Sequence, residues 1–284
     1  MNAMKKMKKT NYHTHSLFCD GKNSVEEMVL SAIEKGFDIL GFSSHSMCRF
    51  SDDWHLKVEE HSAYAEEVRR VKREYSDKIS IQLGFEADYI YGLCKPHKAD
   101  FRQYSPDYLI GAVHYVMNEN GCFAVDDSEE NVKAGLENVF GGNKRELVHA
   151  YFESEREMIA KGNFDIIAHA DLIRKHNAKL ELFDEEASEY KEELKLTAKE
   201  IKRAGVIAEI NTGGMARGYL KEPYPSPYFL SLLSELKVPV TYSSDAHKAQ
   251  NLDFSYEEAL AYIKKADYKE IAYLEDGSLK LIRL

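Results

Sequence analysis

Several of the eleven histidines in this 284-residue sequence stand in positions where they could bind metal ions. His13 and His15 are separated by a single residue. Because side chains alternate along an extended strand, both imidazoles point to the same side and can bind one ion. Asp245 and His247 have the same spacing and would do likewise if the chain is extended there. A His-x-His pair alone is a weak signal, so its meaning depends on the elements around it.

Short apolar or β-branched runs alternate with longer amphipathic segments, which is typical of β-α units around a parallel sheet. We expect seven strands, at residues 10–13, 38–43, 79–84, 108–113, 164–168, 206–210 and 238–243. Helices with one apolar face are expected at residues 58–75, 144–161, 185–204 and 227–236. Two segments that start at Ser24 and Ser255 have a Glu three residues later, which predicts a capping box at each helix start.

Each of six predicted strands is followed by His, Asp or Glu. These residues are His13, His15 and Asp20, then His45, Glu86, His114, His169, and finally Asp245 and His247; the sixth strand is followed by Asn211. The carboxyl ends of the strands of a β/α barrel meet at one rim, so residues far apart in sequence would share one pocket. Imidazole and carboxylate without cysteine suit zinc, manganese or iron. The sequence therefore predicts a metal site.

The other histidines lack this placement. We expect His55, His61, His97, His149 and His176 to be surface residues, and Trp54 to be a packing or rim residue. Residues 117–142 are polar and predict a long insertion over one face, either a lid over a substrate or a solvated acidic loop. Residues 271–274 and 279–284, around Asp276-Gly277, predict a hairpin.

Composition excludes several classes of protein. Lys and Arg number 38 and Asp and Glu 48, so the net charge is 38 − 48 = −10, which argues against nucleic acid as a partner. No apolar run approaches the roughly 18 residues of a membrane span, and no apolar segment near the start could act as a signal peptide, so we expect a cytoplasmic protein. Without a linker-like stretch, residues 1–284 predict one domain, with a core over about 10–250 and a C-terminal helix and hairpin over 251–284.

Together these motifs resemble the PHP (polymerase and histidinol phosphatase) superfamily, and most of all its stand-alone histidinol-phosphate phosphatases. The motifs are Tyr12-His-Thr-His-Ser-Leu-Phe-Cys-Asp-Gly21, Gly41-Phe-Ser-Ser-His45, Gly84-Phe-Glu86, Gly111-Ala-Val-His114, Ile167-Ala-His169 and Ser243-Ser-Asp-Ala-His247. The resemblance implies a distorted, TIM-like (β/α)7 barrel with the metal site at the C-terminal ends of its strands. This agrees with the count of seven strands.

The resemblance also implies two or three divalent ions, of zinc, manganese or iron. One would be held by His13, His15, Glu86 and Asp245, a second by Asp20, His45 and His247, and a third by Glu86, His114 and His169. Many family members have histidine where this chain has Asp20, and an oxygen ligand makes that site harder. Arg174 and Arg217, which follow the fifth and sixth strands, resemble phosphate-binding arginines of the family.

The activity implied is hydrolysis of L-histidinol phosphate to L-histidinol and phosphate in histidine biosynthesis, by a hydroxide between the ions that attacks phosphorus in line. Alternatives are another small phosphomonoester, a nucleotide phosphodiester, or a metal-binding module without catalysis. Amidohydrolases also begin with His-x-His, but Glu86 has no role in their scheme. The sequence assigns neither the general acid, nor the residues that contact the imidazole and amine of histidinol, nor the oligomeric state.

Overall fold

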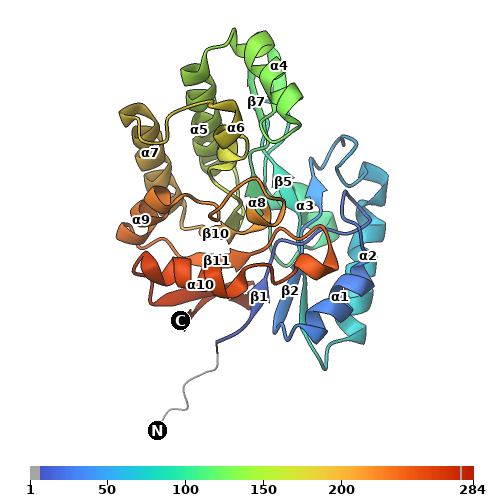
Figure 1. Cartoon of the computed structure of the whole chain (residues 1–284). Coiled ribbons are helices and arrows are strands. Elements are labelled where there is room, and N and C mark those ends of the chain that lie inside the picture. Colours follow the sequence, from blue (N-terminus) through green and yellow to red (C-terminus); the bar gives the residue numbers. More distant parts are fainter. Residues whose placement is uncertain (1–6, 276) are drawn as a thin grey trace.

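The computed structural model describes residues 7–275 and 277–284 and has an α/β fold whose central strands are mostly parallel (Figure 1). The parallel strands are β1 (Thr10–Asn11), β2 (Ile39–Phe42), β3 (His45–Ser46), β4 (Ser80–Leu83), β5 (Glu86–Asp88), β6 (Ile110–Ala112), β9 (Ile166–Ile167), β10 (Ile207–Asn211) and β11 (Val240–Ser243). Each of the seven predicted strand positions overlaps one of them. The structure adds β3 and β5, which continue the lines of β2 and β4 after a two-residue break.

These strands divide into two sheets, with the orders β1-β2-β4 and β11-β10-β9-β6-β5-β3. A parallel bridge between Thr14 and Ala246 brings the chain after β1 beside the chain after β11. There the His15 amide donates to the Ala246 carbonyl at 3.0 Å. The closed (β/α)7 barrel implied by the resemblance stays a prediction, because the hydrogen-bonded strands form two sheets.

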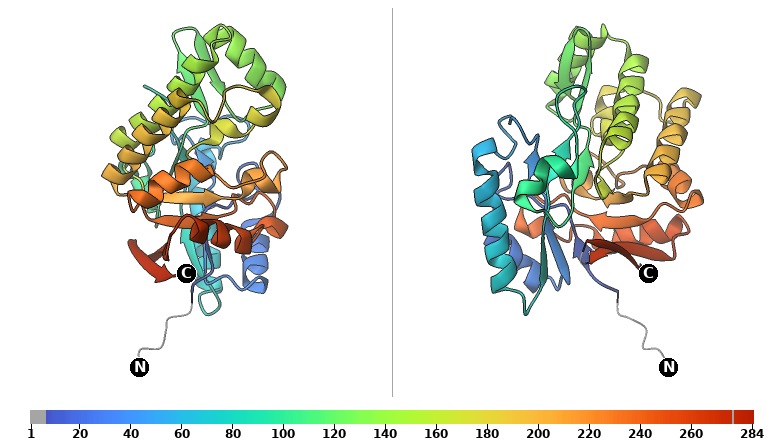
Figure 2. Two further views of the ribbon diagram at one scale, coloured as in Figure 1. Left: turned by 60° about the vertical axis from the view of Figure 1, so that its left-hand side comes forward. Right: turned by 180° about the vertical axis from the view of Figure 1, so that it is seen from behind.

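Helices surround these sheets (Figures 1 and 2). They are α1 (Val25–Glu34), α2 (His61–Glu74), α3 (Lys98–Phe101), α4 (Glu129–Phe140), α5 (Lys144–Lys161), α6 (Asn177–Leu180), α7 (Ser188–Ala204), α8 (Gly213–Ala216), α9 (Pro227–Glu235) and α10 (Tyr256–Lys265). The predicted helices correspond to α2, α5, α7 and α9. Alternation of strands and helices thus follows the predicted β-α pattern.

The two predicted capping boxes have different outcomes. At α1 the Glu27 amide donates to Ser24 Oγ at 3.2 Å, and the Ser24 amide donates to Glu27 Oε2 at 2.8 Å, which confirms the first. The second is wrong, because Ser255 has a φ of 52° and its side chain accepts no capping hydrogen bond. An N-cap residue needs an extended backbone for its hydroxyl to reach the amides of the first turn.

Residues 117–142 are folded rather than a polar loop. They contain most of an antiparallel hairpin, β7 (Tyr115–Asn118) and β8 (Gly121–Ala124), and the whole of α4. In α4 the side chains of Val132, Leu136 and Val139 are buried. The views in Figure 2 show the hairpin and α4 extending from one end of the molecule. Residues 115–140 thus form a folded insertion made of this hairpin and α4, which we call the 115–140 wall.

Tyr108 packs between the strands close to the predicted site, where its hydroxyl lies next to the carbonyl of Tyr12, the residue before His13. Its side chain is fully buried, and its hydroxyl donates to the Phe42 carbonyl at 3.0 Å. A Cβ atom at Gly41 or Gly84 would come within 2.4 Å of Tyr108, so both positions require glycine for the ring to fit. Packing of this kind fixes the strands from which the candidate site residues project.

The C-terminal hairpin is confirmed as the antiparallel pair β12 (Glu270–Glu275) and β13 (Ser278–Arg283). Of the predicted turn dipeptide, Asp276 lies outside the described residues, while Gly277 has a φ of 69°. The Gln82 side chain donates to the Leu274 carbonyl at 3.0 Å, which ties the hairpin to β4. Among the described residues, no helix has the length and apolar character needed to cross a membrane.

Candidate metal centre

The structure brings together all nine residues predicted to bind metal. They form overlapping groups whose ligand atoms lie within 4.8 Å of one another: His15, Asp20, His45 and His247; His13, His15 and Asp245; His13, Glu86 and His169; His45, Glu86 and His114. The groups gather where the parallel strands end, as the positions of these residues after the predicted strands suggested.

Glu86, the first residue of β5, lies at the centre of the cluster and is fully buried. Its Oε2 lies 2.8 Å from His13 Nε2 and 2.7 Å from His45 Nδ1, and its Oε1 lies 3.0 Å from His169 Nε2. Burial raises the pKa of this carboxyl, but the imidazoles of His13 and His45 outweigh it and hold the pKa well below its usual range. Glu86 is therefore an anionic acceptor shared by several groups.

Asp245 joins the cluster from the loop after β11. Its Oδ1 lies 3.2 Å from His15 Nε2, and Arg217 Nη2 donates to its Oδ2 at 2.8 Å. Asp245 has a φ of 50°, which costs a non-glycine residue about 1–2 kcal/mol. The chain is not extended here, so the condition attached to the same-side arrangement of Asp245 and His247 is not met. The two side chains nevertheless lie together, with Asp245 Oδ1 3.5 Å from His247 Nδ1, and His247 Nε2 lies 3.0 Å from Asp20 Oδ2.

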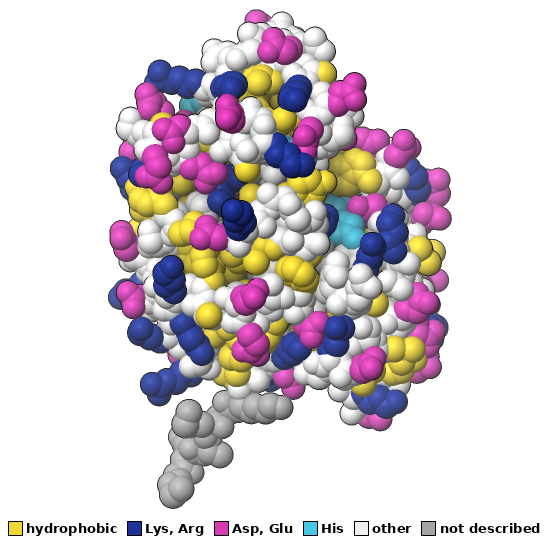
Figure 3. Space-filling view, in the orientation of Figure 1, with side chains coloured by type: hydrophobic (Ala, Val, Ile, Leu, Met, Phe, Trp, Pro, Cys, Tyr) yellow, Lys and Arg dark blue, Asp and Glu magenta, His cyan; other side chains and the backbone are white. Residues whose placement is uncertain are grey.

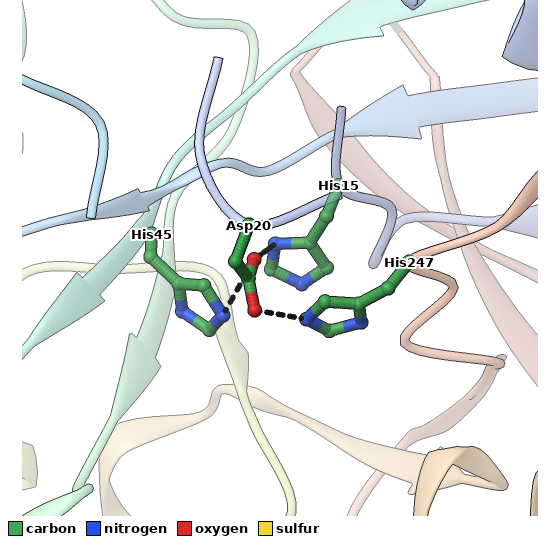
Figure 4. A group of neighbouring side chains, drawn as sticks. All are labelled: His15, Asp20, His45 and His247. Atoms are coloured by element: carbon green, nitrogen blue, oxygen red, sulfur yellow. Dashed lines mark ion pairs between the residues drawn. The ribbon is translucent and has the colours of Figure 1, made fainter. Parts of the chain in front are cut away.

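The group in Figure 4 forms the open edge of the cluster. Asp20 Oδ1 lies 3.9 Å from His15 Nδ1 and 3.8 Å from His45 Nε2. The side chains of Asp20 and His247 are 31% and 20% exposed, whereas His15 is fully buried. A ligand can therefore approach the cluster from the side of Asp20 and His247.

Besides His169 Nδ1, six buried polar atoms of the cluster form no hydrogen bond of good geometry among the described residues, although several of them lie only 2.7–3.2 Å apart. They are His13 Nε2, His15 Nε2, Asp20 Oδ1, His45 Nδ1, Glu86 Oε2 and Asp245 Oδ1. Leaving buried polar groups unpaired is costly, and most such groups in proteins find a partner. Divalent cations would satisfy all six, because neutral imidazole and carboxylate are their preferred ligands. The site is a divalent-metal site by its donor set and by these unpaired atoms.

A cavity of about 1220 Å³ opens above the metal site. Asp20, His45, His114, His169, Asp245 and His247 line its base, while Phe123, Asp126, Asn131 and Gly135 of the 115–140 wall line another side. In Figure 3 a histidine side chain shows at the surface beside Lys or Arg side chains, between the upper part of the molecule and its right-hand side. The insertion therefore forms part of this cavity, which favours the substrate-related reading over a solvated loop.

The two predicted phosphate-binding arginines differ in position. Arg217 lines the cavity. Arg174 is buried, with Nε 2.8 Å from Glu185 Oε2 and Nη1 3.6 Å from Asp171 Oδ2, and it is not among the residues that line the cavity. Its neighbour Lys175 does line it, and there the Lys175 ammonium pairs with Asp126 at 3.5 Å.

The sequence model of the family described as PHP domain matches residues 11–213. The chain belongs to the PHP domain family. A protein of Schizosaccharomyces pombe named "Probable histidinol-phosphatase" is 29% identical over 93% of this chain and 89% of that protein. The crystal structure of the hisK protein of Listeria monocytogenes matches with a TM-score of 0.77 and 24% identity, covering 88% of this chain and 99% of that one.

The HISK protein of Lactococcus lactis, whose crystal structure is a complex with zinc, L-histidinol and phosphate, matches with a TM-score of 0.69 and 21% identity. The match covers 97% of this chain and 100% of that one. These likenesses show that this PHP domain shares their fold, and the family match confirms the resemblance found in the motifs.

Two carboxylates outside the predicted ligand set form hydrogen bonds with candidate metal ligands of this PHP domain, and neither was identified from the sequence. Glu209 Oε1 of β10 lies 2.7 Å from His13 Nδ1, and Asp88 Oδ1 of β5 lies 2.5 Å from His114 Nδ1. Such outer partners orient a ligating imidazole and fix its tautomer. The available signal was the strand period, since Asp88 follows Glu86 by two residues.

The expectation of surface histidines is wrong for His55, His61 and His176, which are all buried. His55 Nε2 lies 2.6 Å from Asp88 Oδ2, His61 Nε2 2.6 Å from Ser46 Oγ, and His176 Nε2 2.7 Å from the Asp127 carbonyl. Each partner is distant in sequence, so local pattern gave no indication of it. His149 is exposed as expected, and Trp54 lies at the cavity with its ring 4.7 Å from that of His45.

Proposed function

We propose that this chain hydrolyses L-histidinol phosphate to L-histidinol and phosphate in histidine biosynthesis. The observation that carries the proposal is the cluster of nine imidazole and carboxylate side chains, with its unpaired buried atoms, at the base of an open cavity. The name of the Schizosaccharomyces pombe relative and the histidinol and phosphate bound by the Lactococcus lactis protein support this substrate.

We infer that two or three ions of zinc, manganese or iron bind this cluster. One would be held by His13, His15, Glu86 and Asp245, a second by Asp20, His45 and His247, and a third by Glu86, His114 and His169. Support comes from the overlap of the observed groups at Glu86 and His15. When bound, divalent ions neutralise phosphate charge, lower the pKa of water to about 7 and stabilise the leaving oxygen.

The residues of the chain supply the remaining functions. Arg217 donates to Asp245 and also lines the cavity, so its guanidinium can hold a phosphate oxygen while it keeps this ligand in place. Lys175, which pairs with Asp126, also lines the cavity and provides a second positive charge there. Arg174 could contribute only if its guanidinium leaves Asp171 and Glu185, so we assign the direct phosphate contacts to Arg217 and Lys175.

We also propose that the strands form a distorted (β/α)7 barrel. The strands are paired in the orders β1-β2-β4 and β3-β5-β6-β9-β10-β11. Because β3 continues β2 and β5 continues β4, these nine strands amount to seven chain segments. The Thr14–Ala246 bridge brings the last segment beside the first. In such an arrangement all the ligands would stand on one rim, where barrel enzymes carry their active sites.

The test is phosphate release from four substrates: L-histidinol phosphate, p-nitrophenyl phosphate, a dinucleotide and a phosphotyrosine peptide, each with Mn²⁺, with Zn²⁺ or with a chelator. We expect a metal-dependent kcat/KM for histidinol phosphate several orders of magnitude above the others. Faster turnover of the dinucleotide would move the function to a phosphodiester. Equal, slow turnover of all four would refute the proposed substrate and leave the metal site intact.

A further inference from the structure

Behind the candidate metal ligand His114 lies a buried chain of two further side chains, Asp88 and His55. We infer that Asp88 and His55 are positioning residues that hold the His114 imidazole in the tautomer and orientation needed to bind a metal ion. The inference rests on the proposed metal site and assigns functions to two residues outside the ligand set.

The first step is the strand register. Glu86 and Asp88 are two residues apart in β5, so their side chains leave the same face of the strand. Glu86 reaches the centre of the cluster, and Asp88 reaches its flank. Both carboxylates are at least 99% buried. Asp88 is thus placed beside the cluster without being one of the residues in any of its ligand groups.

The second step is the hydrogen bonding of Asp88. Its Oδ1 lies 2.5 Å from His114 Nδ1, and its Oδ2 lies 2.6 Å from His55 Nε2. An ionised carboxylate only accepts hydrogen bonds, so His114 must carry its proton on Nδ1. The lone pair is then on Nε2, the nitrogen that faces Glu86 Oε1 at 3.5 Å. Asp88 therefore leaves available the nitrogen that a metal ion would use.

The third step explains His55. If Asp88 contacted only His114, its buried Oδ2 would have no hydrogen-bond partner. His55 provides that partner. His55 is itself 1% exposed, and the Trp54 ring covers it at a centroid distance of 3.8 Å. Trp54 also contacts the His114 ring edge-on at 5.2 Å. The segment before α2 thus encloses the Asp88 carboxylate and fixes its rotamer.

The parallel with Glu209 supports this reading. Glu209 lies 2.7 Å from His13 Nδ1 and also accepts hydrogen bonds from the His169 amide at 3.0 Å and Asn211 Nδ2 at 2.9 Å. The imidazoles of His13 and His114 are therefore each hydrogen-bonded to a buried carboxylate. The second oxygen of each carboxylate also has a hydrogen-bond partner. Loss of such an outer partner typically lowers metal affinity about 10–100-fold.

The experiment is calorimetric titration of Mn²⁺ into metal-free protein carrying Asp88→Asn, beside the parent and Asp77→Asn, a matched change of an exposed aspartate. Asparagine keeps an acceptor for His114 Nδ1 but removes the negative charge. We expect affinity at one site to fall about 10–100-fold, while metal-free Asp88→Asn and parent proteins unfold at similar temperatures. Unchanged Mn²⁺ affinity in Asp88→Asn would overturn the inference.

A second pair of variants keeps the test decisive if Asp88→Asn fails to fold. His55→Gln retains a donor near the place of Nε2, and His55→Leu removes it. We expect Mn²⁺ affinity close to the parent for His55→Gln and a clear loss for His55→Leu; equal affinities in the pair would contradict the role of His55. Because the readout is metal binding, failure of the parent to hydrolyse histidinol phosphate would refute the proposed function alone.

Discussion

Glu86 contacts five imidazoles through its two oxygens, at distances of 2.7–3.6 Å, and no other candidate ligand contacts as many histidines. We predict that Glu86→Ala loses bound metal and phosphatase activity together, by more than the roughly 100-fold that an outer partner costs. Metal content by mass spectrometry and phosphate release measure the two losses. Glu235→Ala, at an exposed residue of α9, should keep both. Full activity in Glu86→Ala would refute the metal centre as the catalytic site.

Glu155 of α5 offers a prediction about pH. Burial raises the pKa of its carboxyl well above the ordinary value, and Tyr151 donates to its Oε1 at 3.0 Å. Below the ordinary pKa of about 4.3 both states hold the proton. Above it the unfolded state ionises first, so the stability contributed by Glu155 is lost as pH rises through the folded-state pKa.

Glu155→Gln cannot ionise and therefore escapes this loss. Relative to the parent, we expect its free energy of unfolding to increase by about 1.4 kcal/mol per pH unit between the two pKa values. Urea unfolding at pH 5 and at pH 8 measures the difference. The exposed residue Glu235, changed to Gln, provides the control. A difference between Glu155→Gln and parent that is the same at both pH values would contradict the prediction.

Among the elements, the 115–140 wall depends on a close contact between α4 and β8. A Cβ atom at Gly135 would lie 2.3 Å from the Phe123 ring. Helix propensity alone favours Gly135→Ala by about 1 kcal/mol, but overpacking typically costs about 1–3 kcal/mol. We therefore predict a less stable wall and a several-fold higher KM for histidinol phosphate, with metal content unchanged. Lys133→Ala on the exposed face of α4 is the control, and a KM like that of the parent would contradict the prediction.

The elements also show which parts of the fold are readable from the sequence. Strands such as β10 and β11 were predictable because most of their residues are apolar or β-branched and polar residues follow them. Strands β3 and β5 were not, because they consist largely of site residues, His45-Ser46 and Glu86-Ala87-Asp88, whose pairing comes from neighbouring strands. Helix α4 did carry a signal, the helical spacing of Val132, Leu136 and Val139, within a segment judged by its polar composition.

The residues of the candidate site can likewise be divided into those that the sequence predicts and those that it does not. The grouping of the nine candidate ligands could be predicted because their positions after the strands repeat along the chain, and parallel strands bring such positions together. Asp88 carried a signal in its spacing of two residues from Glu86, whereas His55 did not, because its contact with Asp88 joins residues 33 positions apart, which no local pattern encodes. The placement of Arg174 against Glu185 and Asp171 is likewise a property of packing. Chemistry at strand ends is thus easier to predict than the side chains that support it.

At the scale of the whole molecule, the ligands join segments from His13 to His247. Metal ions would therefore link most of the parallel strands at one end. An ion that binds only the folded state adds about 2.7 kcal/mol at a concentration 100 times its dissociation constant. For chains of about this size, each kcal/mol raises the melting temperature by about 2–4 °C.

We predict that removal of the metal by a chelator lowers the melting temperature of the parent by about 5–10 °C for each ion lost. Scanning calorimetry with and without chelator, followed by addition of excess Mn²⁺, measures the shift and its reversal. Glu86→Ala should melt at the same temperature with and without chelator, because it has no metal to lose, whereas Glu235→Ala should respond as the parent does. A parent protein whose melting temperature is indifferent to chelator would show that the ions do not hold the strand ends together, even if they act in catalysis.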